Sequence, residues 1–212
     1  MRKVRERELV LATRALFDQR GMLDAPIEEI AKSVGIARGL IYRQFSSKEE
    51  LFVLTVTDYL AELAETLDAA IPRAASPMTQ LEQGMEAYAL FCQRYPAFLD
   101  SSLSLMHQPA SKLHEIVSES VWLRLGQGIA RCVDPLVQVL RDGAEAGTFE
   151  VSDPEFMANF LWTQVQGAMH LARIRVGVSQ VAPGIPELFP IAPEQVVRTC
   201  VASALATIQA RP

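Results

Sequence analysis

The stretch that decides the fold reads GIARGLIYRQFSSKEEL and runs from Gly35 to Leu51. Ile41 and Phe45 are four residues apart, and this spacing predicts a short helix, beginning near Ala37, that buries both side chains. Three cationic side chains lie among and just after these apolar residues, in a protein whose formal net charge is −5. The pattern therefore predicts a small helix with one apolar face and one basic face.

Further helices are expected on both sides of this short helix. Ser47 and Glu50 have the spacing of a capping box and open a longer helix after it. Before it, an apolar stripe ends at Gly21, and a second helix begins with Asp24 as its N-cap and Pro26 in its first turn. The first 60 residues are thus three short helices leading into a longer one. A tight turn between the second and third gives the helix-turn-helix layout.

The rest of the chain is predicted to be helical almost throughout, because Leu and Ala dominate and no alternation of β-branched residues is evident. The expected helices cover residues 78–94, 97–106, 111–146, 154–177 and 193–209, and Gly126 and Pro135 are points where the third could break. The proline-rich segments 72–77 and 181–194 are interpreted as loops. The predicted fold class is all-α.

The composition is that of an ordinary folded protein. Hydrophobic residues make up 50% of the 212 residues, and no apolar run approaches the roughly 18 residues of a membrane span. We expect a cytoplasmic protein whose three cysteines, Cys92, Cys132 and Cys200, are free thiols. Residues 1–55 hold ten Lys or Arg against eight Asp or Glu, whereas the remainder holds ten against seventeen. A basic head on an acidic body favours contact between the head and a polyanion.

The first 60 residues resemble the N-terminal domain of the TetR family of bacterial transcriptional regulators. The motifs that carry the resemblance occur in order and at the family's spacing: Leu16-Phe17 with Gly21, Ile30-Ala31, Gly35-Ile36, Gly39, Tyr42, Phe45 and Ser47-Lys48-Glu49. The resemblance implies a helix-turn-helix domain at residues 1–50 and a helical ligand-binding and dimerisation domain at 51–212, linked by a helix at about 48–67. Three positions depart from the family: Ala37 replaces a usual Ser, Ala25-Pro26 replaces a Thr-rich segment, and Gln44 replaces a common His.

The resemblance makes the short helix a recognition helix, which lies in the major groove of DNA. Arg38 and Arg43 can each form two hydrogen bonds with guanine or hold a phosphate. Gly39 lets the backbone approach the duplex, and Lys48 places a cation beside free backbone N–H groups at a helix start. The expected DNA-binding residues are Arg38, Gly39, Tyr42, Arg43, Gln44, Lys48 and Ala37. Taken singly, the three cations could instead form a solvated face, and Tyr42 could belong to the core.

Large apolar residues with a few polar groups in the middle helices are the expected lining of a small-molecule cavity. The candidates are Tyr88, Phe91, Met106, His107, Trp122, Trp162, Gln166 and His170. Aromatic and Met residues at helical spacing could equally be ordinary core. No cofactor is expected, and no metal site either, because the histidines lack Asp or Cys residues at ligand spacing.

The resemblance implies a homodimer, formed through residues 154–177 and 193–209, whose two-fold axis matches a palindromic operator. It further implies a repressor that a small, largely apolar inducer releases from double-stranded DNA. A helix-turn-helix activator or a non-induced DNA-binding factor is the alternative. An enzyme is a remote one, because the sequence contains no GxSxG, HExxH, P-loop or GxGxxG motif.

Overall fold

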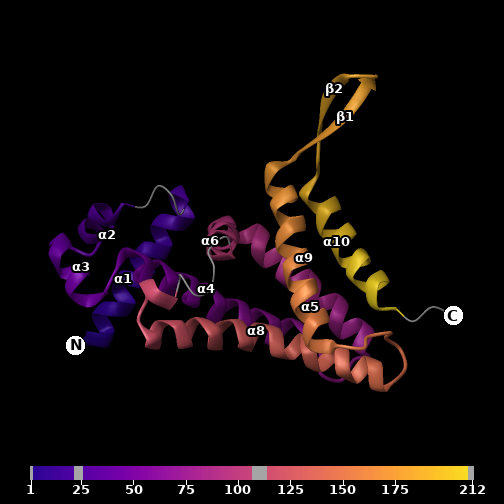
Figure 1. Cartoon of the computed structure of the whole chain (residues 1–212), viewed down its shortest axis with the longest axis horizontal. Coiled ribbons are helices and arrows are strands. Elements are labelled where there is room, and N and C mark those ends of the chain that lie inside the picture. The colour runs from indigo at the N-terminus through magenta and orange to yellow at the C-terminus, as the bar shows by residue number, and fades with distance from the viewer. Residues whose placement is uncertain (1, 22–25, 107–113, 210–212) are drawn as a thin grey trace. The chain divides into compact units, whose positions relative to one another are not determined.

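The computed structural model describes residues 2–21, 26–106 and 114–209, and these are mostly helical, as predicted (Figure 1). In chain order the elements are α1 (Arg2–Arg20), α2 (Ile27–Ser33), α3 (Arg38–Gln44), α4 (Lys48–Ala70), α5 (Pro77–Arg94), α6 (Pro96–Met106), α8 (Glu119–Glu145), α9 (Pro154–Ile174), β1 (Val176–Ala182), β2 (Ile185–Pro190) and α10 (Pro193–Ile208). They form two compact units. Unit 1 comprises Met1–Ala64 and Tyr95–Arg131, and unit 2 comprises Glu65–Arg94 and Cys132–Pro212.

The apolar residues of the first three helices form the core of unit 1. Leu9 and Phe17 of α1, Ile30 of α2 and Ile41 of α3 are all almost completely buried. The Phe17 ring meets the edge of the Phe52 ring of α4 at a centroid distance of 5.0 Å. The helical spacing of these side chains therefore assembles α1, α2 and α3 around one shared core.

Glycines end the first two helices where the sequence predicts. Gly21 follows α1 with φ +83°, and Gly35 follows α2 with φ +68°, a left-handed conformation that favours glycine. The expected N-cap of α2, Asp24, lies outside the described residues. Pro26 occupies the N-cap position itself and not the predicted first turn, and Ile27 begins the helix. The N-cap thus lies two residues after the predicted one, and the helix-turn-helix layout is intact.

Unit 2 consists of packed helices and a hairpin. α5, α9 and α10 contact one another, and α9 begins as predicted. The Asp153 side chain accepts a hydrogen bond from the backbone N–H of Phe156 at 2.9 Å, and Pro154 follows it. The Phe149 ring, four residues beyond the end of α8, lies directly over Gly143 of that helix. A Cβ on Gly143 would come within 2.0 Å of the ring.

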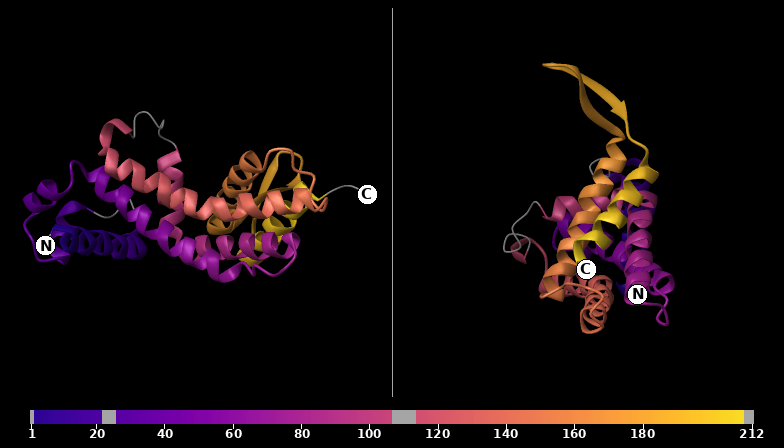
Figure 2. Two further views of the ribbon diagram at one scale, coloured as in Figure 1. Left: turned by 90° about the horizontal axis from the view of Figure 1, so that it is seen from below. Right: turned by 90° about the vertical axis from the view of Figure 1, so that its right-hand side faces the viewer.

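The segment interpreted as a loop, 181–194, is where the prediction is wrong. β1 and β2 form an antiparallel hairpin, which extends beyond the ends of α9 and α10 (Figures 1 and 2). The expected helix 154–177 ends at Ile174, because Arg175 turns the backbone into the left-handed region with φ 58°. Because this conformation is uncommon for residues other than glycine, the sequence does not indicate that the helix ends here.

The helix expected at 111–146 is also corrected. α8 begins at Glu119, and it continues through both Gly126 and Pro135 to Glu145 without a break. Residues 111–113 lie outside the described residues. Pro135 is tolerated inside the helix although it removes one backbone donor.

Candidate nucleic-acid interface and ligand cavity

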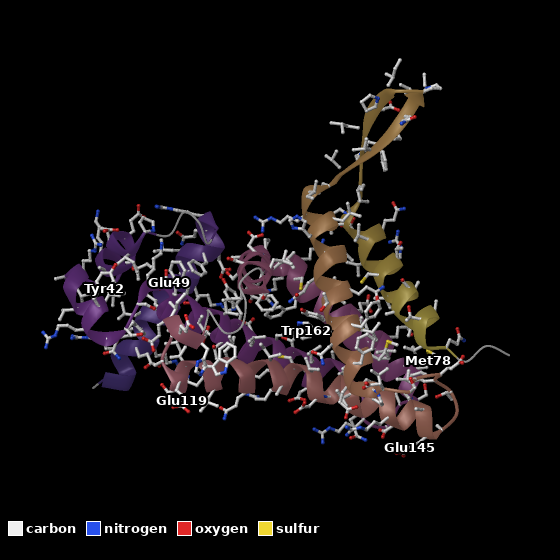
Figure 3. All side chains as sticks on the ribbon, viewed as in Figure 1. Tyr42, Glu49, Met78, Glu119, Glu145 and Trp162 are labelled. Carbon is white, nitrogen blue, oxygen red and sulfur yellow. The ribbon has the colours of Figure 1, made fainter. Side chains whose placement is uncertain are left out.

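Helix α3 has one buried face and one exposed face. Ile41 is 1% exposed, and Phe45, which follows the helix, is 3% exposed. Tyr42, labelled in Figure 3, is 45% exposed, and Arg38 and Arg43 are exposed as well. The two apolar anchors thus turn the arginines and the tyrosine of α3 toward solvent.

Gly39 lies on this exposed face with open space beside it. A Cβ built on Gly39 would meet no described atom within 4 Å. Glycine inside a helix costs roughly 0.5–1 kcal/mol relative to alanine. Because packing within the described chain does not require a glycine here, the absence of a side chain leaves the α3 backbone open to an external surface.

Arg38 makes contacts in the free protein that the sequence did not reveal. Its Nη1 lies 2.6 Å from Glu28 Oε1 of α2, and its guanidinium carbon lies 5.5 Å from the centre of the Tyr42 ring. Interaction with the Tyr42 hydroxyl, followed by the charge of Glu28, raises the pKa of Arg38. These contacts orient Arg38 on the surface. Glu28 was missed because the pair joins two helices ten residues apart and obeys no local spacing rule.

The predicted capping box at the start of α4 is confirmed and extended. The Glu50 N–H donates to Ser47 Oγ at 3.0 Å, and the Glu50 carboxylate accepts from Ser46 Oγ at 2.6 Å. That carboxylate also accepts from Ser118 Oγ, and Ser47 Oγ donates to the Ile116 carbonyl at 3.3 Å. The segment that precedes α8 is thereby tied to the first turn of α4.

Burial by itself would raise the pKa of Glu50. The hydrogen bonds from Ser118 and Ser46 outweigh this effect, and they hold the pKa below its ordinary value. Glu50 is therefore a carboxylate at neutral pH and serves as a structural acceptor at the end of the helix-turn-helix segment.

The remaining DNA-binding candidates flank α3. Ala37 is exposed at the N-cap and provides no side-chain cap. Gln44 is half-buried at the last position of α3. Lys48 is exposed at the start of α4, where its Nζ lies 4.9 Å from the centre of the Phe52 ring. The sequence-predicted residues therefore lie on α3 and on the turns at its two ends.

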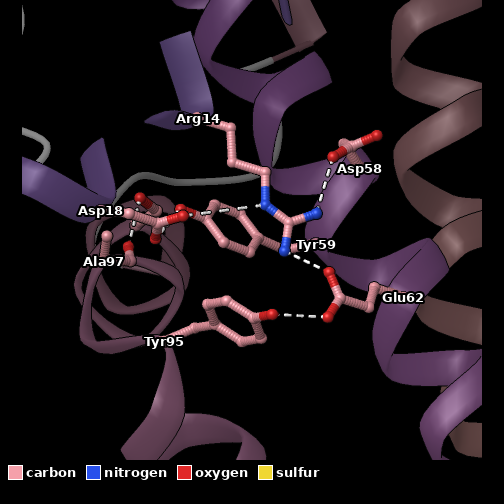
Figure 4. Close-up of polar contacts among 8 residues, drawn as sticks. Arg14, Asp18, Asp58, Tyr59, Glu62, Tyr95 and Ala97 are labelled. Atoms are coloured by element: carbon pink, nitrogen blue, oxygen red, sulfur yellow. Dashed lines mark hydrogen bonds and ion pairs between the residues drawn. The ribbon is translucent and has the colours of Figure 1, made fainter. Parts of the chain in front are cut away.

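A charged cluster fastens α1 to the rest of unit 1 (Figure 4). Arg14 Nη1 donates to Asp58 Oδ2 of α4 at 2.8 Å, and Nη2 donates to Glu62. Tyr95, just before α6, donates from its hydroxyl to Glu62 Oε1 at 2.6 Å. The Arg14 guanidinium also lies over the rings of Tyr59 and Tyr95. These contacts join α1, α4 and the start of α6 around one arginine.

Unit 2 contains a small apolar cavity. It is lined by Leu67, Ile71, Gln80, Leu81, Gly84, Met85, Tyr88, Cys132, Leu136, Val139 and Trp162. The Tyr88 and Trp162 rings stack at one side, with centroids 4.2 Å apart and planes 21° apart. The centre of a water-sized sphere has only about 20 Å³ available, which is room for roughly one water molecule.

Two buried polar atoms near this cavity lack a hydrogen-bond partner of good geometry among the described residues. They are Tyr88 Oη and Gln166 Oε1. Burial, before any other influence, raises the pKa of Tyr88 well above its usual value, so the hydroxyl is protonated at neutral pH. An unpaired buried polar group is costly, and a molecule that supplies the missing partner would be favoured here.

The other cavity candidates are dispersed. Phe91 is buried in α5 but does not line the cavity. Trp122 belongs to unit 1, where its ring meets the edge of His114 at 5.6 Å. His170 is exposed on α9. Neither the Met106 side chain nor any part of His107 is among the described atoms. Of the predicted set, Tyr88 and Trp162 line the cavity, and Gln166 lies beside Tyr88 without lining it.

Metal-binding clusters and membrane spans are both absent from residues 2–21, 26–106 and 114–209. Within those ranges, no group of three or more His, Cys, Asp or Glu side chains is placed to hold a metal ion. No helix there is both long enough and apolar enough to cross a membrane.

Comparisons with known proteins agree with the helix-turn-helix geometry. The sequence pattern of the family described as "Bacterial regulatory proteins, tetR family" matches residues 9–54. The HTH-type transcriptional regulator BetI of Brucella anthropi is 35% identical over 81 residues, which are 38% of this chain and 42% of that protein. The protein of the same name from Cronobacter sakazakii is 27% identical over 138 residues, 62% of this chain and 68% of that one. The match thus spans about two fifths of the length of the Brucella relative.

Solved structures resemble the chain over nearly all of its length. The TetR family transcriptional regulator PfmR from Thermus thermophilus superimposes with a TM-score of 0.63 at 21% identity, covering 93% of this chain and 97% of that one. The ketosteroid transcriptional regulator KstR2 of Mycobacterium tuberculosis superimposes with a TM-score of 0.64 at 21% identity, covering 98% and 96%. At these identities the likeness is one of fold. Residues 9–54 thus match the tetR family of bacterial regulatory proteins, and the fold of the whole chain is similar to that of solved TetR-family regulators.

Proposed function

We propose that this protein is a ligand-responsive transcriptional repressor that binds a palindromic operator as a homodimer. The observation that carries the proposal is the exposed face of α3, where Arg38, Tyr42 and Arg43 surround a glycine that no internal contact requires. A recognition helix needs this arrangement, since its side chains must reach base edges while its backbone comes close to the duplex.

Lys48 and Gln44 extend this surface toward the start of α4. Lys48 is exposed beside a helix N-terminus, which suits a phosphate contact that fixes the register of the protein on DNA. In this proposal residues 1–50 are the DNA-binding domain, and 51–212 bind the effector and dimerise. The helix α4 belongs to both parts.

The effector is a small, neutral and largely apolar molecule. None of the residues that line the cavity carries a formal charge. The unpartnered oxygens of Tyr88 and Gln166 favour a molecule with one hydrogen-bond acceptor and one donor. Because the free space is close to that of a single water, the effector must separate the Tyr88 and Trp162 rings when it enters. By linkage, an effector that weakens operator binding is itself bound more weakly in the presence of operator.

The dimer is formed through α9 and α10. Phe156, Phe160 and Ile174 of α9 are 64%, 47% and 52% exposed, which is unusual for large apolar residues along one helix. Gly167, on the same helix, has open space where a Cβ would lie. An apolar helix with a small residue at its middle suits close contact with a symmetry-related helix.

The DNA-binding role is tested with duplexes selected from a random pool by the wild-type protein. Arg38→Ala and Tyr42→Ala are each expected to abolish binding in gel-shift titrations, while the circular dichroism spectrum stays that of the wild type. Arg20→Ala is a matched control, because Arg20 is also an exposed arginine paired with a glutamate of α2 but lies at the end of α1 and not on α3. Unchanged binding by both α3 variants would overturn the proposal.

Two further measurements test the regulatory part. A promoter fused to a reporter is expected to be more active when the gene is deleted, whereas lower activity would indicate an activator. Thermal-shift screening of neutral metabolites is expected to identify a stabilising ligand that competes with operator DNA. If the Trp162→Ala variant responds to that ligand as the wild type does, the cavity is not its binding site.

A further inference from the structure

The β1–β2 hairpin exposes more apolar surface than a free hairpin can sustain. Val178 and Leu188 are cross-strand partners, yet they are 69% and 70% exposed. Every residue of β2 is exposed. In Figure 3 the side chains of the hairpin lie beyond the ends of α9 and α10, with no other described element of unit 2 beside them. A two-stranded hairpin is marginally stable in water, so this one needs a surface on which to pack.

The register divides the hairpin into two unlike faces. Cross-strand partners share a face. The pairs Val176–Pro190, Val178–Leu188 and Gln180–Pro186 make up one face, on which Gln180 is the single polar side chain. On the other face Ser179 pairs with Glu187, and Phe189 folds its ring over Gly177. The residues of the apolar face are exposed in both strands, whereas Gly177 and Ser179 on the other face are half-buried.

The prolines of β2 indicate that a partner would contact the apolar face of the hairpin and would not pair with the outer edge of β2. The Ile191 N–H donates to the Arg175 carbonyl at 2.9 Å. In an antiparallel pair this bonding alternates, so Pro186 and Pro190 occupy positions whose N–H would point outward. Proline has no N–H to offer, and the outer edge of β2 is therefore a poor template for another strand.

A groove of matching chemistry lies in the same unit, at the base of the hairpin. Its lining comes from α9, the end of β2 and α10: Gln164, Ala168, Leu171, Phe189, Pro190, Ile191, Gln195, Val196, Thr199, Cys200 and Ser203. The centre of a water-sized sphere has about 370 Å³ available there, far more than in the small cavity beside Tyr88 and Trp162. No lining residue is charged, and Glu187, the single charged residue of the hairpin, lies on its other face. Depletion of charge is typical of the buried centre of a protein interface.

We propose that the hairpin is a dimerisation arm whose apolar face packs into the α9–α10 groove of a second copy of this chain. The proposal rests on the homodimer proposed above and adds a contact to it. A two-fold interface uses the same two patches twice, so arm and groove on one chain supply both halves of a reciprocal contact. The groove continues into the exposed Leu171 of α9, so the arm contact joins the helix contact as one surface.

The first test measures dimerisation by sedimentation equilibrium. Val178→Asp combined with Leu188→Asp places two charges on the apolar face and is expected to raise the dimer dissociation constant at least ~100-fold. Ser179→Asp is the matched control, because it adds a charge to the other face of the same strand. It is expected to change the constant less than about threefold. Equal dimerisation of the two variants, with wild-type circular dichroism, overturns the proposal.

A second test asks whether the arm reaches the partner. One preparation carries Leu188→Cys on the arm and the other carries Thr199→Cys in the groove. Both also carry Cys200→Ser, because Cys200 lines the groove beside Thr199, and since Cys92 and Cys132 are buried, the introduced thiols are the accessible ones. Mild oxidation of the mixture is expected to give a disulfide-linked heterodimer, and mass spectrometry should show that the disulfide joins the two substituted positions. The absence of that linkage in a mixture that does dimerise overturns the proposal.

The outcomes separate the arm from the proposed function. If the arm variants dimerise normally and the protein still binds its operator, the arm proposal fails alone. If the variants lose dimerisation but the wild type binds no duplex, the arm is supported and the DNA-binding role fails. A wild type that remains monomeric at all concentrations contradicts both the arm and the proposed dimer.

Discussion

Arg14 and Arg38 are both arginines of unit 1, but their surroundings differ. The Arg14 side chain is 13% exposed and donates to two carboxylates, and its guanidinium lies over two tyrosine rings. The Arg38 side chain is 58% exposed and pairs with Glu28 and a single ring. A guanidinium has five N–H donors. Arg14 is engaged by its own protein from several sides, whereas the exposed Arg38 can still present donors to a further acceptor.

This difference distinguishes Arg14, a structural cation, from Arg38, the cation that we propose binds DNA. Burial alone would lower the pKa of Arg14, but hydrogen bonds to Asp58 and Glu62 outweigh it and raise the pKa. The site is therefore built to hold a permanent positive charge between α1 and α4. Arg38 is held in place by weak surface contacts, which cost little to exchange for a phosphate or a guanine.

Arg14→Ala is expected to have the largest effect on stability. It leaves Asp58 and Glu62 partly buried without their cation and removes the packing against two rings. Since Asp58 and Glu62 are only partly buried, we expect a loss of about 2–4 kcal/mol in the free energy of unfolding. This corresponds to a fall of roughly 5–15 °C in melting temperature for a chain of this size.

Arg20→Ala provides the control for that substitution, since Arg20 also joins α1 to another helix but through an exposed pair with Glu29. It is expected to change the melting temperature by less than about 2 °C. If Arg14→Ala melts like Arg20→Ala, the cluster in Figure 4 does not hold α1 in place.

Glu50→Gln is expected to lower stability by about 1–2 kcal/mol at neutral pH, because the carboxylate accepts hydrogen bonds from Ser46 and Ser118. The folded state lowers the pKa of Glu50, so its contribution is present above the unfolded pKa and is lost as pH falls through the folded pKa. The difference in the free energy of unfolding between wild type and Glu50→Gln should therefore shrink below about pH 4.5.

Urea unfolding at pH 7 and pH 3.5 measures this difference. Glu49→Gln serves as the control, because Glu49 occupies the same first turn of α4 but is exposed. A pH-independent difference between wild type and Glu50→Gln would mean that the ionised form of Glu50 is not the one that stabilises the fold.

The helices could be predicted from the sequence wherever a local device sets their ends. Gly21 and Gly35 adopt positive φ, Asp153 caps α9, and Ser47 caps α4, all within a few residues of the helix concerned. The end of α9 could not be predicted, because Arg175 adopts φ 58° without a glycine or asparagine. The hairpin was hidden for a similar reason: its prolines suggested a loop, although both of those in β2 occupy positions that need no N–H donor.

The candidate site likewise has features that the sequence predicts and features that it does not. The outward face of α3 follows from the four-residue spacing of Ile41 and Phe45, so its exposed residues were predictable. The contact of Ser118 with Glu50 spans 68 residues and arises from tertiary packing alone. Spacing on a single helix also does not reveal which compact unit an aromatic residue belongs to, and Trp122 and Trp162 consequently appeared equivalent.

Gly39→Ala is expected to act on stability and on DNA binding in opposite directions. Its Cβ meets no described atom, so the variant should gain about 0.5–1 kcal/mol of stability. In the proposed complex the added methyl group would face the duplex, and it should weaken operator binding by about 10-fold. Gly143→Ala is the contrasting control, because its Cβ would collide with the buried Phe149 ring and should lower stability. If operator affinity is unchanged in Gly39→Ala, the backbone of α3 does not approach DNA closely.

The smallest expected effect comes from Glu28→Gln, which releases Arg38 without altering the size of the side chain. The pair is exposed, so the melting temperature should change by less than about 1 °C. Operator affinity should rise for two reasons. Arg38 no longer has to leave the Glu28 carboxylate before it binds a phosphate, and the negative charge of Glu28 no longer repels the DNA. Glu29→Gln removes the same charge from the neighbouring residue, whose carboxylate pairs with Arg20. Titration of both variants at one salt concentration should show a gain about 2–5-fold larger for Glu28→Gln than for Glu29→Gln. Equal gains would mean that net charge alone is responsible and that Glu28 does not compete with DNA for Arg38.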